Sequence, residues 1–206
     1  MSSVVIEAVE ADSGAHAFRQ RLLDGLAESI VERGYRDTTV ADVVRNAKTS
    51  KRTFYGEFAS KEECFVQLLR TNNDALITSI QAAVDPDAEW DKQIRSAVRA
   101  YVDHISERPA ITLSWIREAP ALEAVAQPLH RIAMEQLTDM LVVLTDSPGF
   151  RRAGISPISR PLALILLGGL RELTAQVVER GGDLHDISEP AYVAGIAIVG
   201  AGVSPA

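Results

Sequence analysis

A cluster of basic side chains in an otherwise acidic chain has the chemistry of phosphate binding. The cluster consists of Arg45, Lys48, Lys51, Arg52 and Lys61. Only one acid, Glu57, lies between its ends, whereas the chain of 206 residues has a formal net charge of −7. Contact with a nucleic-acid backbone requires such a local reversal in the sign of the charge. The alternative is a solvated helix that happens to be basic, so the elements that carry the cluster decide between the two.

Donor groups and apolar groups occupy different sides of the helix expected in the middle of this stretch. Phe54 and Phe58 are four residues apart and form its buried line. The donors off that line are Lys51, Arg52, Thr53 and Tyr55. Lys51 and Arg52 begin the helix, where the backbone dipole favours phosphate. This division is what a recognition helix in the major groove requires.

Two short helices and a break are predicted to position these groups. Apolar residues recur with the period of a helix over residues 40–47. Thr39 is the expected N-cap of this helix, and Asp42 follows three residues later. After a break at Lys48 and Thr49, Ser50 caps a second helix that ends near Phe58. Two short helices around a break that carry this charge pattern indicate a helix-turn-helix.

The rest of the chain is also predicted to be helical. A helix begins at His16 and ends before Gly34, where a left-handed cap is expected. Ser60 starts a capping box in front of a helix to about Val84. Further helices are expected over residues 87–107, 109–118, 121–146, 159–180 and 189–203, with a kink or a start at Pro128 and a loop over residues 147–157. The fold class is therefore all-α, with about nine helices.

The composition of the chain argues against several other classes of protein. Hydrophobic residues make up 47% of the chain, enough for a core, and aromatic residues only 5%. The acidic balance excludes a uniformly basic nucleic-acid binder. The single cysteine, Cys64, has no partner for a disulfide or a metal site. The sequence shows no signal peptide, and its most apolar run is shorter than the ~20 residues of a membrane helix. We expect a cytoplasmic protein with no membrane partner.

Two motifs resemble the DNA-binding domain of the TetR (tetracycline-repressor-like) family of bacterial regulators. The entry motif is Gly-Tyr-x-x-Thr-Thr-Val over residues 34–40, and the exit motif is Thr-Phe-Tyr-x-x-Phe-x-Ser-Lys-Glu-Glu over residues 53–63. The resemblance spans about residues 16–69 and extends to the rest of the chain only in length and helical character. It implies a DNA-binding domain over 16–62 and a ligand-binding and dimerisation domain over 63–206, whereas residues 1–15 show no periodic pattern and are expected to form a flexible arm.

The resemblance also implies roles for single residues. Thr39, Tyr55 and Lys61 would contact phosphate, while Ser50 to Thr53 would face bases and backbone. The predicted DNA-binding residues are Thr39, Lys48, Ser50, Lys51, Arg52, Thr53, Tyr55 and Lys61.

Four positions of the DNA-binding motif depart from the family pattern. Lys48 and Thr49 replace the usual Gly-Val, so a non-glycine residue must adopt the turn geometry. Gly56 removes one possible base contact, and Glu57 would repel phosphate or accept from a cytosine amine. The operator sequence therefore does not follow from the resemblance.

The C-terminal helices offer residues for a pocket and for a dimer interface. An apolar or amphipathic ligand is predicted to contact Leu76, Ile80, Tyr101, His104, Ile111, Trp115, His130 and Met134, although simple core packing is the alternative for each. The helix over 159–180 is apolar around more of its circumference than one core needs, and Gly168 and Gly169 would permit close approach of a second helix. The predicted dimer residues are Leu162, Ile165, Gly168, Gly169, Leu173 and Ile196.

These features together predict a repressor that binds a palindromic operator as a homodimer and is released by a small ligand. The alternative is a regulator without a small ligand, controlled by a protein partner or acting as an activator. No HExxH, GxSxG, P-loop or GxGxxG motif is present, so an enzyme is not expected. His104 and His130 have no metal-ligand spacing, and neither a metal nor another cofactor is predicted.

Overall fold

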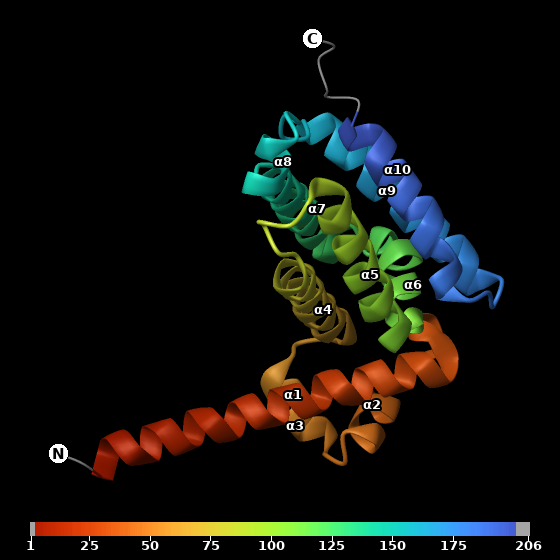
Figure 1. Ribbon diagram of the computed structural model, residues 1–206. Coiled ribbons are helices and arrows are strands. Elements are labelled where there is room, and N and C mark those ends of the chain that lie inside the picture. The colour runs from red at the N-terminus through yellow and green to blue at the C-terminus, as the bar shows by residue number, and fades with distance from the viewer. Residues whose placement is uncertain (1–2, 201–206) are drawn as a thin grey trace. The chain divides into compact units, whose positions relative to one another are not determined.

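The computed structural model describes residues 3–200, without the side chains of residues 3–16 and 123–125. Over that range it contains ten α-helices, two short 3₁₀ helices and no strand (Figure 1). The predicted all-α class is confirmed, and the chain divides into two compact units, residues 1–69 and 70–206. Residues 1–2 and 201–206, which contain the ends of the predicted arm and of the predicted last helix, lie outside the description.

The first unit contains the three predicted N-terminal helices. They are α1 (Ser3–Asp37), α2 (Val40–Asn46) and α3 (Lys51–Glu57). Gly34, inside α1, has a φ of 80°, so the regular helix stops at the glycine that the sequence predicts as a C-cap. In the structure α1 already begins at Ser3, within the segment that is predicted to be an arm. The flexibility of that arm stays a prediction.

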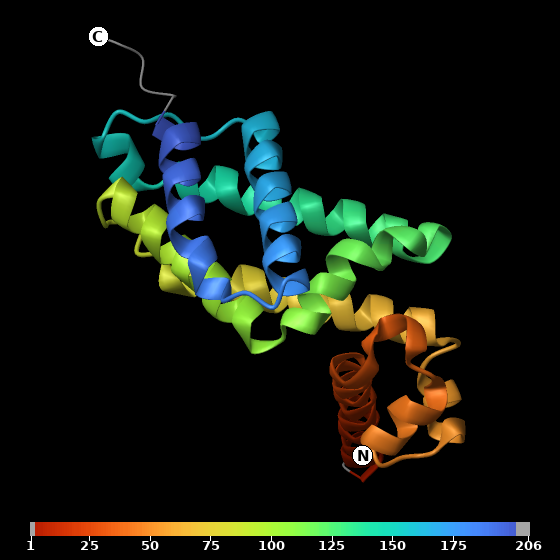
Figure 2. The same ribbon diagram turned by 90° about the vertical axis from the view of Figure 1, so that its right-hand side faces the viewer.

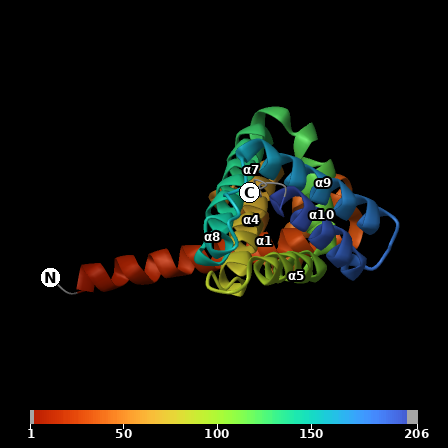
Figure 3. The same cartoon turned by 45° about the horizontal axis from the view of Figure 1, so that its top comes forward.

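The second unit follows without a break in the backbone, because α4 (Lys61–Ala83) continues from one unit into the other. The remaining elements are α5 (Trp90–Glu107), α6 (Pro109–Arg117), η1 (Ala119–Ala121), α7 (Glu123–Thr145), α8 (Pro148–Arg152), α9 (Arg160–Glu179), η2 (Leu184–Ile187) and α10 (Ser188–Gly200). Within this unit α9 and α10 lie side by side, as Figure 2 shows. Figure 3 shows α10 along α5 as well.

Close packing of α1 on α2 fixes the first unit. A methyl group on Gly25 would come within 2.7 Å of both the Val43 carbonyl oxygen and the Ala47 nitrogen. Only a residue without a side chain permits this approach of two backbones. The core around it contains fully buried residues of all four helices, including Leu22, Leu26, Ile30, Val43, Phe54, Phe58, Phe65 and Leu69.

The second unit has three neighbouring apolar clusters. One joins Phe150, Ile155 and Ala163 to α5 and α10. Another joins Ile80 of α4 to α7 and Leu167 of α9. A third joins Val102, Ile105 and Ile187. Because α5 and α9 contribute to more than one cluster, they tie the helices of this unit together.

The predicted loop over 147–157 and one of the two alternatives for Pro128, a helix start, differ from the structure, while a kink at Pro128 stays a prediction. The segment predicted as a loop over 147–157 contains the short helix α8, which begins with Pro148 in its first turn, a position that needs no N–H donor. Pro128 lies inside α7, which starts five residues earlier. A proline in the second turn leaves most of the helix ladder intact, so α7 neither starts at Pro128 nor ends there.

One described helix, α9, is long and apolar enough to cross a membrane by length and composition alone. Of its most apolar window, 28% is buried. The same helix carries Arg171 and Glu172 at mid-length and packs against α6 and α7. Charged side chains in the middle of a membrane-spanning helix are costly in a bilayer. The apolar composition of α9 is therefore better explained by an exposed apolar surface on a helix of this folded unit.

Candidate DNA interface

The N-terminus of α2 is closed by a reciprocal pair of hydrogen bonds. Thr39 Oγ1 accepts from the Asp42 N–H at 3.3 Å, and Asp42 Oδ2 accepts from the Thr39 N–H at 3.0 Å. The Thr39 hydroxyl donates to the same carboxylate at 2.7 Å. The predicted cap of this helix is therefore confirmed, and the exposed Thr39 hydroxyl at the start of α2 both accepts from and donates to Asp42.

Asp42 is held ionised by this arrangement. The Thr39 hydroxyl and backbone N–H, and then the Arg45 guanidinium at 2.8 Å, keep the pKa of the Asp42 carboxyl well below its usual range. Arg33 adds a second cation at 3.3 Å. Arg45, one member of the basic cluster, is thus occupied in part by a carboxylate of its own helix.

Helix α3 presents its donors as the sequence predicts. Ser50 Oγ accepts from the Thr53 N–H at 3.1 Å and lies 3.0 Å from the Thr53 hydroxyl. Lys51 and Arg52 are exposed in the first turn and make no ion pair or hydrogen bond with any residue that the structure describes. Phe54 is fully buried at the opposite side of the helix. Two unpaired cations therefore stand at the positive end of a helix, where anions bind best.

Tyr55 also faces outward on α3. Its side chain is 58% exposed, and its ring packs edge-on against Phe54 with the centroids 5.4 Å apart. The contact fixes the ring and leaves the hydroxyl in solvent. An exposed hydroxyl on a fixed ring is well placed to donate to a phosphate oxygen.

The turn between α2 and α3 has the geometry that the sequence suggests. Lys48 has a φ of 49° and is the one residue other than glycine with a positive φ in the described chain. This left-handed conformation costs an L-residue roughly 1–2 kcal/mol. The side chain is exposed and makes no ion pair with a described residue. The strained residue thus supplies an additional cation beside α3 that has no ion-pair partner among the described residues.

Glu57 has a partner that the sequence does not reveal. Arg19 of α1 donates to the Glu57 carbonyl oxygen at 3.2 Å, and its guanidinium lies 3.7 Å from the Glu57 carboxylate. The same guanidinium lies over the Phe58 ring at 4.4 Å from its centroid. Arg19 therefore compensates the single acid of the basic cluster and caps the C-terminus of α3.

Lys61 lies at the start of α4 and faces the end of α1. Its Nζ donates to the Tyr35 carbonyl at 3.0 Å and to the Thr38 carbonyl at 2.8 Å, and lies 4.3 Å from the centre of the Tyr35 ring. Two of the three ammonium donors are thus used inside the protein. Of the eight predicted DNA-binding residues, seven lie at the N-cap of α2, in the turn after α2 or on α3, and Lys61 is the first residue of α4.

Six of the eight predicted pocket residues fall into two groups. Leu76, Ile80, Tyr101 and Met134 contribute to one apolar cluster of α4, α5, α7 and α9. Trp115 lies near His130, with ring centroids 6.2 Å apart. His104 and Ile111 lie on α5 and α6, where Ile111 is fully buried. Core packing, the alternative considered for each residue, accounts for Ile80 and Ile111.

The second group includes a cation that the sequence analysis missed. Arg171 Nη1 of α9 lies 3.3 Å from His130 Nε2 and 3.7 Å from Met134 Sδ. Burial and the neighbouring Arg171 lower the pKa of His130, so the ring is neutral near pH 7. The signal in the sequence was weak, because a lone arginine on an apolar helix looks like any surface charge.

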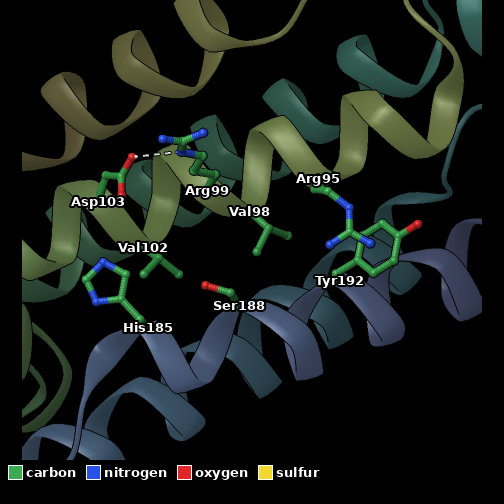
Figure 4. Close-up of a pocket in the computed structure, with 8 residues that line it drawn as sticks. All are labelled: Arg95, Val98, Arg99, Val102, Asp103, His185, Ser188 and Tyr192. Carbon is green, nitrogen blue, oxygen red and sulfur yellow. Dashed lines mark ion pairs between the residues drawn. The ribbon is translucent and has the colours of Figure 1, made fainter.

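An open groove elsewhere in this unit contains none of the predicted pocket residues. It lies between α5 and the η2–α10 segment and is lined by Arg95, Val98, Arg99, Val102, Asp103, His185, Ser188 and Tyr192 (Figure 4). Arg95 stacks on the Tyr192 ring at 3.7 Å, and Arg99 pairs with Asp103 at 3.7 Å. Its cations are thus already engaged within the chain.

The predicted dimer residues occupy an apolar surface of α9. Leu162 and Ile165 are 39% and 63% exposed, and a side chain on Gly168 or Gly169 would meet nothing within 4 Å. Leu173 and Ile196 are partly buried against clusters of their own subunit. No group of three or more potential metal ligands occurs among the described residues.

Two short helices with a buried inner side, a tight turn and free cations on the outer side define a helix-turn-helix DNA-binding protein. The profile of the family described as "Bacterial regulatory proteins, tetR family" matches residues 22–68. The chain is 33% identical over 104 residues to the HTH-type transcriptional repressor KstR2 of Mycobacterium tuberculosis, in two strains. The match of residues 22–68 confirms the resemblance of this part of the chain to the tetR family.

The KstR2 match covers 50% of this chain and 52% of the relative, so the chain aligns with about half the length of these curated relatives. Solved structures extend the likeness in fold. FadR from Bacillus subtilis, in complex with stearoyl-CoA, has a TM-score of 0.72 at 16% identity and covers 88% of this chain and 98% of its own. A transcriptional regulator from Rhodococcus sp. Rha1 has a TM-score of 0.72 at 17% identity, with coverage of 91% and 99%.

Proposed function

We propose that this protein is a transcriptional repressor that binds a palindromic operator as a homodimer and is released by a small apolar or amphipathic ligand. The observation that carries the proposal is the pair Lys51 and Arg52, exposed and unpaired at the N-terminus of α3. A free cation at a helix N-terminus on the outer side of a helix-turn-helix has no use in the folded chain alone. The use that we propose for it is contact with DNA. Since bacterial DNA lies in the cytoplasm, the proposed location of the protein is the cytoplasm.

The proposed DNA contacts follow from the positions of the eight residues. Lys51, Arg52, Ser50 and Thr53 enter the major groove with the start of α3. Thr39, Lys48 and Tyr55 bind phosphates on either side. Lys61 keeps one free donor for a phosphate while its other two hold the end of α1.

The proposed dimer uses α9 and α10. The exposed apolar side chains Leu162, Leu164 and Ile165 on α9 and Val193 on α10 support it, because a monomer gains nothing from exposing them. Gly168 and Gly169 leave room for a second backbone to approach. Two-fold symmetry of the protein corresponds to a palindromic operator whose half-sites lie a helical turn or more apart.

The proposed ligand site lies in the second unit, around Tyr101, Trp115, His130 and Met134. The FadR structure with stearoyl-CoA supports an amphipathic ligand, since that protein shares the fold. The unbroken backbone of α4 supports coupling, because this helix belongs to both units. A ligand that shifts α4 would change the separation of the two α3 helices, and a coupling of about 1–3 kcal/mol suffices for about 5–150-fold weaker DNA binding.

Selection of bound sequences from random duplex DNA, repeated with metabolite pools, tests the function. We expect enrichment of an inverted repeat by the full-length protein and its loss with some pools. Failure to enrich any sequence would falsify DNA-binding regulation. An inverted repeat that persists with every pool would instead support control by a protein partner, or activation without a small ligand.

A further inference from the structure

Arg171 of α9 is a half-buried cation of the second unit that forms no ion pair with a described carboxylate. Its guanidinium contacts only a neutral ring and a thioether, His130 Nε2 at 3.3 Å and Met134 Sδ at 3.7 Å. Its Nε is buried and makes no hydrogen bond to any described group. Nearly all buried charges in proteins have a counterion or a metal, so this arginine requires an explanation.

The acids nearest to Arg171 along its helix are bound elsewhere. Arg117 of α6 donates to both oxygens of Glu172, at 2.9 and 3.1 Å, and to Glu179 at 2.7 Å. Glu172 attracts Arg171 only at longer range, without an ion pair, and the other groups that act on Arg171 are the Tyr101 hydroxyl and Arg117 itself. The Tyr101 hydroxyl is occupied by Thr174 at 2.6 Å. No described acid therefore forms an ion pair or a hydrogen bond with Arg171.

His130 lacks an acceptor in the same way. Its Nε2 faces the Arg171 donor and accepts from it, so the proton of the neutral ring is on Nδ1. Nδ1 is buried and makes no hydrogen bond to a described residue. Two neighbouring side chains thus each have a buried N–H donor without an acceptor. A ligand with a negatively charged acceptor for Arg171 and a further acceptor atom for His130 Nδ1 would satisfy both.

We propose that Arg171 and His130 form the receptor for an anionic group, a carboxylate or a phosphate, on the effector of this regulator. The inference rests on the ligand-controlled function proposed above and adds the chemical class of the ligand. Arg171 supplies charge and the planar donors that fit two anionic oxygens. Trp115 and Met134 offer apolar surface to the remainder of the molecule.

The test compares three probes that share one chain and differ in the head group. They are dodecanoate, dodecanol and dodecanoyl-CoA, titrated calorimetrically into the full-length protein. We expect an anionic probe to bind about tenfold or more tightly than dodecanol, because charge-assisted bonds replace an unpaired buried cation. Preference for dodecanoate identifies a carboxylate, and preference for dodecanoyl-CoA identifies a phosphate.

Two variants separate charge from shape. Arg171→Met removes the charge and keeps an apolar stem, so we expect the preference over dodecanol to vanish while the affinity for dodecanol stays within about twofold. We also expect a higher unfolding temperature for this variant without ligand, because the unpaired buried charge is gone. Arg180→Met, on the exposed end of the same helix, is the control and should keep the preference.

Several outcomes overturn the inference. Equal binding of dodecanol and the anions, an unchanged preference in Arg171→Met, or no binding of any probe would each do so. Dissociation of the Arg171→Met dimer with the preference intact would assign the charge to the interface instead. The proposed function is judged separately, because release of operator DNA by metabolite pools does not depend on the head group of these probes.

Discussion

The carboxylate of Glu57, the last residue of α3, lies 3.7 Å from Nη1 of Arg19 on α1, and the same nitrogen donates to the Glu57 carbonyl. One guanidinium thus neutralises the acid nearest to the proposed DNA contacts and ties the recognition helix to α1. Because Glu57 is paired with Arg19, its negative charge opposes DNA binding less, and the same contact holds the end of α3 against α1.

Removal of Arg19 is therefore predicted to weaken DNA binding through Glu57. Arg19→Ala should lower operator affinity by about fivefold, because an unpaired carboxylate near phosphate costs about 1 kcal/mol. The double variant Arg19→Ala/Glu57→Gln should recover most of this loss. Measurement of operator affinity in a double-mutant cycle checks the coupling. Arg21→Ala on the same helix is the control, and equal losses with or without Glu57 would contradict the prediction.

Lys48 is predicted to lower the stability of the folded protein and to contact a DNA phosphate. Lys48→Gly should stabilise the protein by about 0.5–1 kcal/mol, because glycine adopts a φ of 49° without strain. The same change should lower the salt slope of DNA binding by about 1. Urea denaturation and salt titrations measure the two effects. A variant that is less stable than the wild type would refute the role of strain.

Tyr55 and Lys61 are predicted to differ in their effect on stability. Tyr55→Phe should weaken DNA binding by about fivefold, the value of one hydrogen bond of about 1 kcal/mol, with unchanged stability. Lys61→Ala should weaken DNA binding and also destabilise the protein by about 1–3 kcal/mol, because it leaves two carbonyls without a charged donor. Parallel DNA-binding and thermal-unfolding measurements compare them. Loss of stability in Tyr55→Phe would show that its hydroxyl has an internal role.

Gly169 is predicted to matter only in the dimer. A side chain there meets nothing within 4 Å in the subunit, so Gly169→Leu should fold normally and yield monomers. Light scattering measures the mass, and circular dichroism verifies the helix content. Gly56→Ala, which also has open space, is the matched control and should leave the dimer intact. A dimer in Gly169→Leu would remove this part of α9 from the interface.

Acid is predicted to weaken the cap of α2. The folded-state pKa of Asp42 lies below its unfolded value, so its contribution to stability is full above about pH 4 and is lost as pH falls through the folded pKa. Asp42→Asn should therefore be less stable than the wild type at neutral pH, with a difference that shrinks below about pH 4. Denaturation at several pH values measures the difference. Asp74→Asn, at an exposed position, should show no such trend.

The local part of the structure was largely predictable from the sequence. The cap of α2 by Thr39, the cap of α3 by Ser50 and the exit from α1 at Gly34 depend on residues within four positions of each other. So does the strained turn at Lys48. Such features follow from backbone chemistry alone, and the helix boundaries follow from them.

The contacts between distant residues were not predictable. Arg19 and Glu57 are 38 positions apart, and Arg171 and His130 are 41. Their pairing depends on how helices pack, and a single sequence carries no signal for it. The same limit explains why Lys61, predicted to face DNA, was not expected to hold two carbonyls of the α1–α2 connection.

The close approach at Gly25 has a consequence for how such a regulator can change over time. Because no side chain fits between α1 and α2, the frame of the helix-turn-helix tolerates little substitution at that contact. The outer surface of α3 is under no such constraint, since Lys51 and Arg52 are exposed and a side chain on Gly56 would meet nothing within 4 Å. New operators can therefore be acquired by replacing surface residues one at a time, without any change in the way the domain folds.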